Sequence, residues 1–235
     1  MTHHLKKLSF IVLIWCIGLP SLALELTPER CEYYARYRTG LPIAGKGYSQ
    51  LTRLDDHHWK YEFKIDGFFV DIEESVTFTW QPGQIIKPDK YHFRQSGWLI
   101  SFREATVDFQ WNHQRVRNDV EDRPWLMKIP DGTLDKLSYQ LQLRLDLAAG
   151  KTDINYRIAD GGLLKLYQFK VVGQEQLDTR YGKLETVIVE RLRPPQSKRK
   201  TTLWYASQLD FTLVKLEHEE ADGEEYQIEL KSVKK

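Results

Sequence analysis

The stretch SYQLQLRLDLAAG, residues 138–150, fits two secondary-structure patterns at once. Apolar and polar residues alternate along it, which is typical of a half-buried strand. The same residues also form two apolar stripes on opposite sides of a helix. The first stripe contains Leu134, Leu137, Leu141, Leu145 and Ala148, and the second contains Tyr139, Leu143 and Leu147.

Composition favours the helix. Residues 134–149 contain no Val, Ile, Thr, Gly or Pro, and most of them are good helix formers. Thr133 or Asp135 can accept the first free N–H groups, and Gly150 stands where a left-handed C-terminal cap belongs. A helix on the outside of a sheet needs one apolar stripe. Two stripes predict contacts on both sides, as when a curved sheet wraps the helix.

Strict alternation dominates the rest of the chain and predicts strands. The segments are WKYEFKID (59–66), VDIEESVTFTW (70–80), TVDFQW (106–111), YQFKV (167–171) and YQIEL (226–230). Turn residues such as Pro82-Gly83, Gly161-Gly162 and Asp222-Gly223 separate them. One face of each strand is polar, which antiparallel sheets tolerate. We therefore expect a mainly β protein, with a large curved antiparallel sheet (a β-roll or partial barrel) wrapped around one principal helix.

The first 23 residues have the pattern of a signal peptide. Lys6 and Lys7 precede an apolar run over residues 8–19, and Ser21 and Ala23 have the small-x-small spacing of a cleavage site. The run is shorter than the roughly 20 residues that a spanning helix needs. We expect cleavage after Ala23, a periplasmic location, no lasting membrane span and a single domain over residues 24–235. An uncleaved membrane anchor is the alternative.

The charge balance and the cysteine content limit the possible partners of the protein and the possible roles of its cysteine. The chain carries 34 Lys and Arg against 33 Asp and Glu, and the predicted cleavage removes two lysines and no acid. This balance argues against nucleic acid as a partner, because phosphate binding needs a basic excess. Cleavage leaves Cys31 alone, without an intramolecular disulfide partner. We expect a buried or inert thiol there, with an inter-chain disulfide or a nucleophile as alternatives.

Three segments resemble one family of exported bacterial proteins. They are IPDGTLDKLS (129–138) with Arg144 beyond it, YQFKVVGQEQLDTRYGKLETVIVERLR (167–193), and TTLWYASQLDFTLVKLEHEEADGEEYQIELKSV (201–233). Together they resemble the DUF3108 family, whose function is unknown, although Thr212-Leu213-Val214-Lys215 stands where the family has a proline. The resemblance implies a periplasmic β-roll or partial barrel around a helix, similar in outline to envelope lipoprotein carriers. It implies no catalytic residues.

The most chemically loaded stretch is DDHHW, residues 55–59. In a strand only Asp55 with His57, or Asp56 with His58, would share a face, and two ligands do not make a metal site. A polar turn before the following strand is the simpler interpretation. The sequence contains no zinc-protease, serine-hydrolase, P-loop or dinucleotide motif. We therefore expect that the protein is not an enzyme and that it has no cofactor and no metal site.

Two functional hypotheses follow. In the first, a concave aromatic sheet face holds an apolar, lipid-like envelope ligand against the second helix stripe. Its candidate ligand-binding residues are Trp59, Tyr61, Phe63, Phe78, Trp80, Tyr139, Leu143 and Leu147. In the second, the protein is a structural or assembly factor that contacts another envelope protein through an exposed apolar patch. A metal-dependent hydrolase at Asp56 and His58 ranks third. The basic segment 191–200, around Pro194-Pro195, predicts a solvated hairpin tip.

Overall fold

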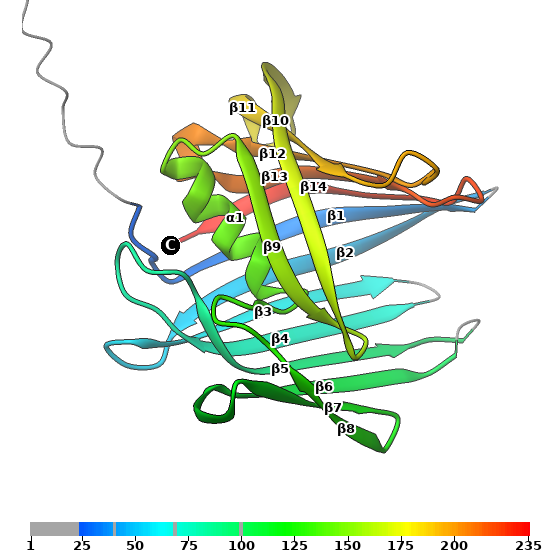
Figure 1. Cartoon of the computed structure of the whole chain (residues 1–235). Coiled ribbons are helices and arrows are strands. Elements are labelled where there is room, and N and C mark those ends of the chain that lie inside the picture. The colour runs from blue at the N-terminus through cyan, green and yellow to red at the C-terminus, as the bar shows by residue number, and fades with distance from the viewer. Residues whose placement is uncertain (1–23, 40, 68–69, 99–100) are drawn as a thin grey trace, which may run out of the picture.

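The computed structural model describes residues 24–39, 41–67, 70–98 and 101–235 (Figure 1). The predicted signal peptide lies outside these residues. Within them the chain forms one antiparallel sheet and one α-helix. The first eight strands are β1 (Glu29–Thr39), β2 (Leu41–Arg53), β3 (His58–Gly67), β4 (Asp71–Thr79), β5 (Lys87–Ser96), β6 (Arg103–Gln110), β7 (Arg115–Val120) and β8 (Arg123–Lys128). The helix α1 (Ser138–Ala148) is followed by β9 (Asp153–Asp160), β10 (Leu163–Thr179), β11 (Gly182–Leu192), β12 (Lys200–Ala206), β13 (Thr212–Glu219) and β14 (Glu225–Lys234).

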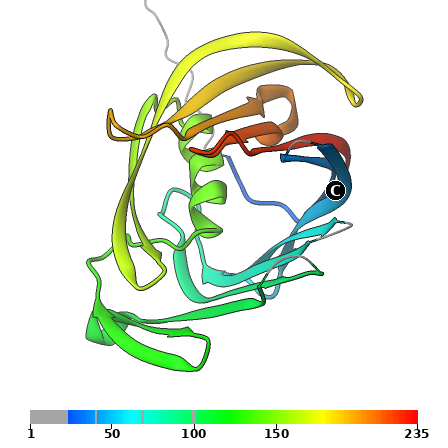
Figure 2. The same cartoon turned by 90° about the vertical axis from the view of Figure 1, so that its right-hand side faces the viewer.

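The strand order makes the sheet a long meander that is not closed. Neighbours run β8-β7-β6-β5-β4-β3-β2-β1-β14-β13-β12-β11-β10-β9, so the first and last strands pair in the middle. The two edges, β8 and β9, are consecutive strands, and the connection between them contains α1. Figure 2 shows α1 inside the curve of the sheet. The predicted mainly β fold, with a curved antiparallel sheet around one helix, is confirmed.

Capping explains where α1 begins and ends. The Asp135 carboxylate accepts the backbone N–H groups of Leu137 and Ser138, each at 2.8 Å. The helix therefore starts at Ser138 and not at residue 134 as predicted, and Leu134 stays extended. Thr133 makes no cap, since its hydroxyl donates to the carbonyl of Pro130. Gly150 has a φ of +80° and donates its N–H to Leu147, as expected of a left-handed cap.

Both predicted helix stripes are covered. Leu141 of the first stripe and Leu143 and Leu147 of the second are all buried in the main core. Four polar residues of α1 are buried as well: Ser138, Gln142, Arg144 and Asp146. Arg144 forms an ion pair with Glu29 of β1 and donates its Nε to the carbonyl of Asp210 at 2.6 Å. A helix buried almost all round is thus tied to the sheet by polar contacts in addition to its leucines.

A seam remains where β8 and β9 do not pair. The chain before α1 forms a single β-bridge to β9, between Leu134 and Ile158. In this bridge the Leu134 N–H donates to the Arg157 carbonyl, and the Leu134 carbonyl accepts from the Ala159 N–H. Farther along, the Trp125 ring of β8 lies against the turn between β9 and β10. A Cβ atom on Gly162 would lie 1.8 Å from Trp125 Cζ2, so the turn needs a glycine there. Side-chain and loop contacts bridge the seam in place of a strand ladder.

The long β10–β11 hairpin folds back onto the centre of the sheet. Its side chains Leu177, Leu184 and Ile188 join a second, smaller core. At the tip, the Arg180 guanidinium lies 4.4 Å from the centre of the Tyr34 ring of β1. The backbone N–H of Arg180 donates to the Glu229 carboxylate of β14 at 3.4 Å. The predicted basic segment is the turn between β11 and β12, as expected. Its Arg199 pairs with Glu220 at 2.6 Å.

Candidate functional site

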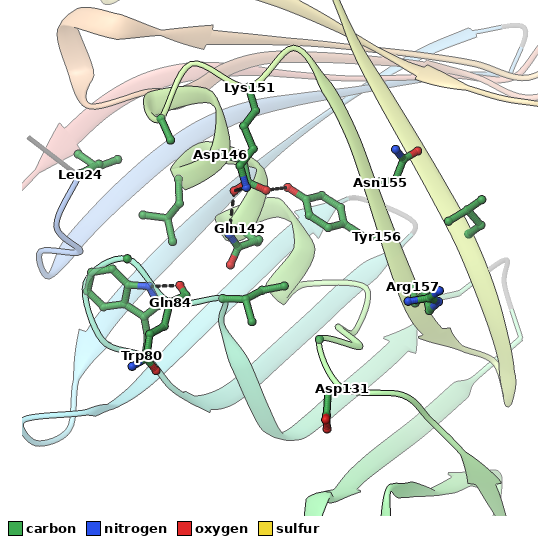
Figure 3. A pocket seen from close by; sticks show the side chains of 16 residues that line it. Leu24, Trp80, Gln84, Asp131, Gln142, Asp146, Lys151, Asn155, Tyr156 and Arg157 are labelled. Atoms are coloured by element: carbon green, nitrogen blue, oxygen red, sulfur yellow. Dashed lines mark hydrogen bonds and ion pairs between the residues drawn. The ribbon is translucent and has the colours of Figure 1, made fainter. Parts of the chain in front are cut away.

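The seam holds a half-open pocket of about 590 Å³ (Figure 3). It lies between α1, the edge strand β9, the segment before β5 and the turn at Asp131-Gly132. Its position follows from the topology, since this is where the sheet fails to close over the helix. The apolar part of its lining comes from Leu24, Trp80, Ile85, Leu145, Ala149 and Leu166.

The floor of the pocket is a polar network centred on Asp146. Its carboxylate accepts hydrogen bonds from Gln142 Nε2 at 3.1 Å, from Lys151 Nζ at 2.8 Å and from the Tyr156 hydroxyl at 2.6 Å (Figure 3). Gln142 in turn accepts the backbone N–H of Ile86 at 2.8 Å. The network therefore joins β9, α1 and the segment before β5 across the pocket floor.

The electrostatics of this floor favour hydrogen bonding over proton transfer. Burial, and then the neighbouring Asp146 charge, raise the pKa of Tyr156 far above its ordinary value. The hydroxyl therefore keeps its proton and remains a donor at all physiological pH values. Asp146 accepts three donors, which is the usual condition for a buried carboxylate. The arrangement can position the polar end of a ligand.

The free edge of β9 lines the same pocket. The N–H and C=O of one residue in an antiparallel strand point to the same side. Since Arg157 and Ala159 bond Leu134 on the open side, Asn155 directs its main-chain groups to that side too. Asn155 and Arg157 both line the pocket and are exposed. The rim thus offers main-chain hydrogen bonds beside the positive charge of Arg157.

The structure brings the eight predicted ligand-binding residues together, as one packed cluster. Trp59, Phe78, Trp80, Leu143 and Leu147 are buried in the main core, while Tyr61, Phe63 and Tyr139 are half-buried and pack against it. Trp59 and Trp80 meet edge to face at 6.4 Å, and Tyr139 stacks on Phe169 at 5.5 Å. Of the eight, Trp80 alone also lines the seam pocket. The helix occupies the space in front of the aromatic face.

Sequence reasoning missed the polar residues of the pocket. Gln142 and Asp146 are four residues apart and lie between the two apolar stripes of the helix. This spacing places them on one helix face, so a shared polar contact was detectable. Their partners Ile86 and Tyr156 lie in other segments of the chain, and no local pattern identifies them.

The DDHHW segment forms a polar turn before β3, as the simpler interpretation predicted. The pairing differs from the strand-based expectation, because Asp55 contacts His58 at 2.9 Å across the turn. Backbone N–H bonds from His57 and His58, together with the His58 ring, hold the pKa of Asp55 at about 2. Among the described residues, no group of three or more His, Cys, Asp or Glu side chains could hold a metal ion. Likewise, no described helix is long and apolar enough to cross a bilayer.

Cys31 is 1% exposed, and burial followed by the charge of Glu29 raises the pKa of its thiol from 9.0 to about 12. Because the thiolate is the reactive form, we expect iodoacetamide at pH 8 to leave Cys31 unmodified in the folded protein and to label it rapidly in urea. The folded protein binds the extra proton, so this group's contribution to stability is lost as pH rises from about 9 to about 12. Peptide mass spectrometry measures the labelling, and rapid labelling of the folded protein would contradict the buried geometry.

Comparisons with known proteins agree with this architecture. Residues 33–231 match the profile of the family described as "Protein of unknown function (DUF3108)". Among curated proteins, none matches the chain by sequence. A crystal structure of a beta-barrel-like protein of domain of unknown function DUF1849 from Brucella abortus is similar, with a TM-score of 0.60 and 9% identity. That likeness covers 90% of this chain and 99% of the other and concerns the fold alone.

A DUF1329 family protein from Desulfovibrio piger matches more distantly, with a TM-score of 0.24 and 12% identity over 88% of this chain and 85% of the other. The family match spans most of the chain: it includes β2 to β13 and α1 in full, and most of β1 and β14. The chain belongs to the DUF3108 family.

Proposed function

We propose that the protein is a non-catalytic binding protein of the periplasm that takes an amphipathic ligand into the seam pocket. The N-terminal pattern of basic, apolar and small residues supports export. The single observation that carries the binding function is the pocket itself. Its volume of about 590 Å³ falls in the range of small-molecule sites, which are mostly apolar with a few placed polar groups.

The chemistry of the lining supports an amphipathic ligand. An apolar body fits against Ile85, Leu145 and Leu166, which belong to three different segments around the pocket. A polar, negatively charged end fits the rim, where the exposed residues Asn155 and Arg157 lie. This assigns the lipid-like ligand of the first hypothesis to the seam and leaves the aromatic face of the sheet as core.

An anionic naphthalene dye, anilinonaphthalene sulfonate, tests this proposal. Ala149 is exposed at the C-terminal end of α1 and lines the pocket, so Ala149→Trp would fill the pocket without touching the core. We expect the dye's affinity to fall by about tenfold or more in this variant, because a bulky ring occupies the binding volume. Ala221→Trp, in the exposed turn between β13 and β14, is the matched control and should bind as the wild type does.

The rim is tested with the neutral analogue phenylnaphthylamine, which lacks the sulfonate. Arg157→Gln should weaken the anionic dye more than the neutral one, because it removes an opposite charge at the rim. Equal dye binding by wild type and Ala149→Trp would exclude the seam as the binding place.

A second candidate function, assembly through protein contacts, is supported by a different observation. Leu164 and Leu166 lie two residues apart on β10, and both are exposed, as is Leu126 on the opposite edge of the seam. Exposed apolar clusters often mark protein interfaces. Crosslinking in the periplasm from a photoreactive residue at position 164 tests it. A specific crosslinked partner that Leu166→Lys abolishes would support this function, and no crosslink would exclude it.

A further inference from the structure

A second cavity, of about 200 Å³, lies beside the contact between Trp125 and Gly162. It is lined by residues of β5, β6, β7 and β8 on one side and by the β9–β10 turn on the other. The residues of the seam pocket are all different from these. At about 30 Å³ for each water in the liquid, the cavity has room for roughly six or seven waters. It is therefore larger than a single bridging water requires.

A fully buried amide lies in the wall of this cavity. Asn118 lies in the middle of β7, opposite Val107 of β6 and Trp125 of β8, and is 0% exposed. Neither its Nδ2 nor its Oδ1 has a hydrogen-bond partner among the residues that the structure describes. An amide offers two donor hydrogens and an acceptor oxygen, and burying them unpaired costs free energy. Such a group in a cavity wall is suited to a ligand that presents the complementary donor and acceptor.

Acids and cations line the cavity in equal number. Two acids line it, and both are engaged: Glu104 with His92 at 2.9 Å, and Asp160 with Lys165 at 2.8 Å. Two cations also line it, Arg103, which is exposed, and Lys136, whose Nζ lies 5.2 Å from the centre of the Phe93 ring. Cations beside already paired acids favour an anionic group on the ligand.

We infer that this cavity is a second binding site, for a small ligand in which an amide group adjoins a carboxylate, as in an N-acylated amino acid. The ligand's amide exchanges two hydrogen bonds with Asn118. Its carboxylate faces Lys136 and Arg103, and its apolar side chain lies against Trp125. The site is separate from the seam pocket, and either one can fail without the other.

N-acetyl-L-leucine is the probe, and heteronuclear NMR is the measurement. We expect saturable shifts of the Asn118 side-chain amide and the Trp125 indole signals, with affinity about tenfold or more weaker in Asn118→Leu. Asn112→Leu is the matched control, because Asn112 is exposed outside the cavity, and should bind as the wild type does. The methyl ester of the probe, which lacks the carboxylate, should bind more weakly than the acid to wild type.

Folding does not confound the result. Asn118→Leu keeps the number and branching of the side-chain heavy atoms and removes an unpaired buried amide, and the cavity gives room for the larger methyl groups. Its melting temperature should therefore equal or exceed that of the wild type. Lys136→Gln is a second variant, on the cavity rim, and should weaken the acid while leaving the ester unchanged. Absence of shifts in the wild type up to about 10 mM probe would mean that only water meets Asn118, and would overturn the inference. Equal binding by Asn118→Leu would overturn it as well.

Discussion

Replacing Arg144 with alanine is expected to destabilise the protein by about 3–5 kcal/mol. The side chains of Arg144 and Glu29 are 10% and 7% exposed, and their ion pair joins the middle of α1 to the first strand. Truncation would leave the Glu29 carboxylate buried without its cation. It would also remove the donor to the Asp210 carbonyl. Urea unfolding followed by circular dichroism measures the loss.

A double variant distinguishes the effect of leaving one buried charge unpaired from the effect of removing both charged side chains. Arg144→Met combined with Glu29→Leu replaces both charges with apolar side chains, which is often neutral for buried pairs. We therefore expect the double variant to recover most of the stability lost in Arg144→Ala. If Arg144→Ala lost less than about 1 kcal/mol, the pair would behave as a solvent-exposed one, contrary to its burial.

Replacing Leu143 with alanine is expected to cost about 2–5 kcal/mol, the usual range for a leucine in a packed core. Leu143 is 0% exposed on the helix face that was predicted to line a ligand cavity. The matched variant is Leu145→Ala, two residues along the same helix, where the side chain is half-buried and lines the seam pocket. It should cost about 1 kcal/mol or less, because solvent already reaches the site.

The comparison of these two leucines tests whether the concave face of the sheet is a packed core or an open ligand-binding surface. A packed face makes Leu143 much the more costly of the two to truncate. If instead Leu143→Ala cost no more than Leu145→Ala, the aromatic face of the sheet would be open enough to hold a ligand. Both variants keep helix propensity, since alanine is the best helix former, so the difference reports on packing.

Local signals were sufficient for the helix and for many of the strands. The leucine stripes, Asp135 and Gly150 located α1 to within four residues at its start and one at its end. Alternation located β3, β4, β6 and parts of β10 and β14. It overextended β4 by one residue at each end, at Val70 and Trp80, and β6 at Trp111. Trp111 begins a short 3-10 turn and donates its indole N–H to the Pro88 carbonyl.

The site was harder to predict because it depends on closure of the sheet. The seam pocket exists where β8 and β9 fail to pair. The sequence pattern of a single segment does not show which strands become the edges of the sheet. Arg144 was visible as a polar residue between leucines, but its partner Glu29 lies 115 positions away. Asn118 resembles an ordinary strand residue in the sequence. Its unpaired amide becomes a candidate site only because the fold places it opposite Trp125 of the edge strand β8.

Native mass spectrometry of the protein, purified without detergent, tests ligand binding at the seam. We expect a complex that releases an apolar, acidic small molecule on denaturation, and loss of that molecule in Ala149→Trp but not in Ala221→Trp. A bare mass for the wild type, or a ligand that Ala149→Trp retains, would contradict binding at the seam.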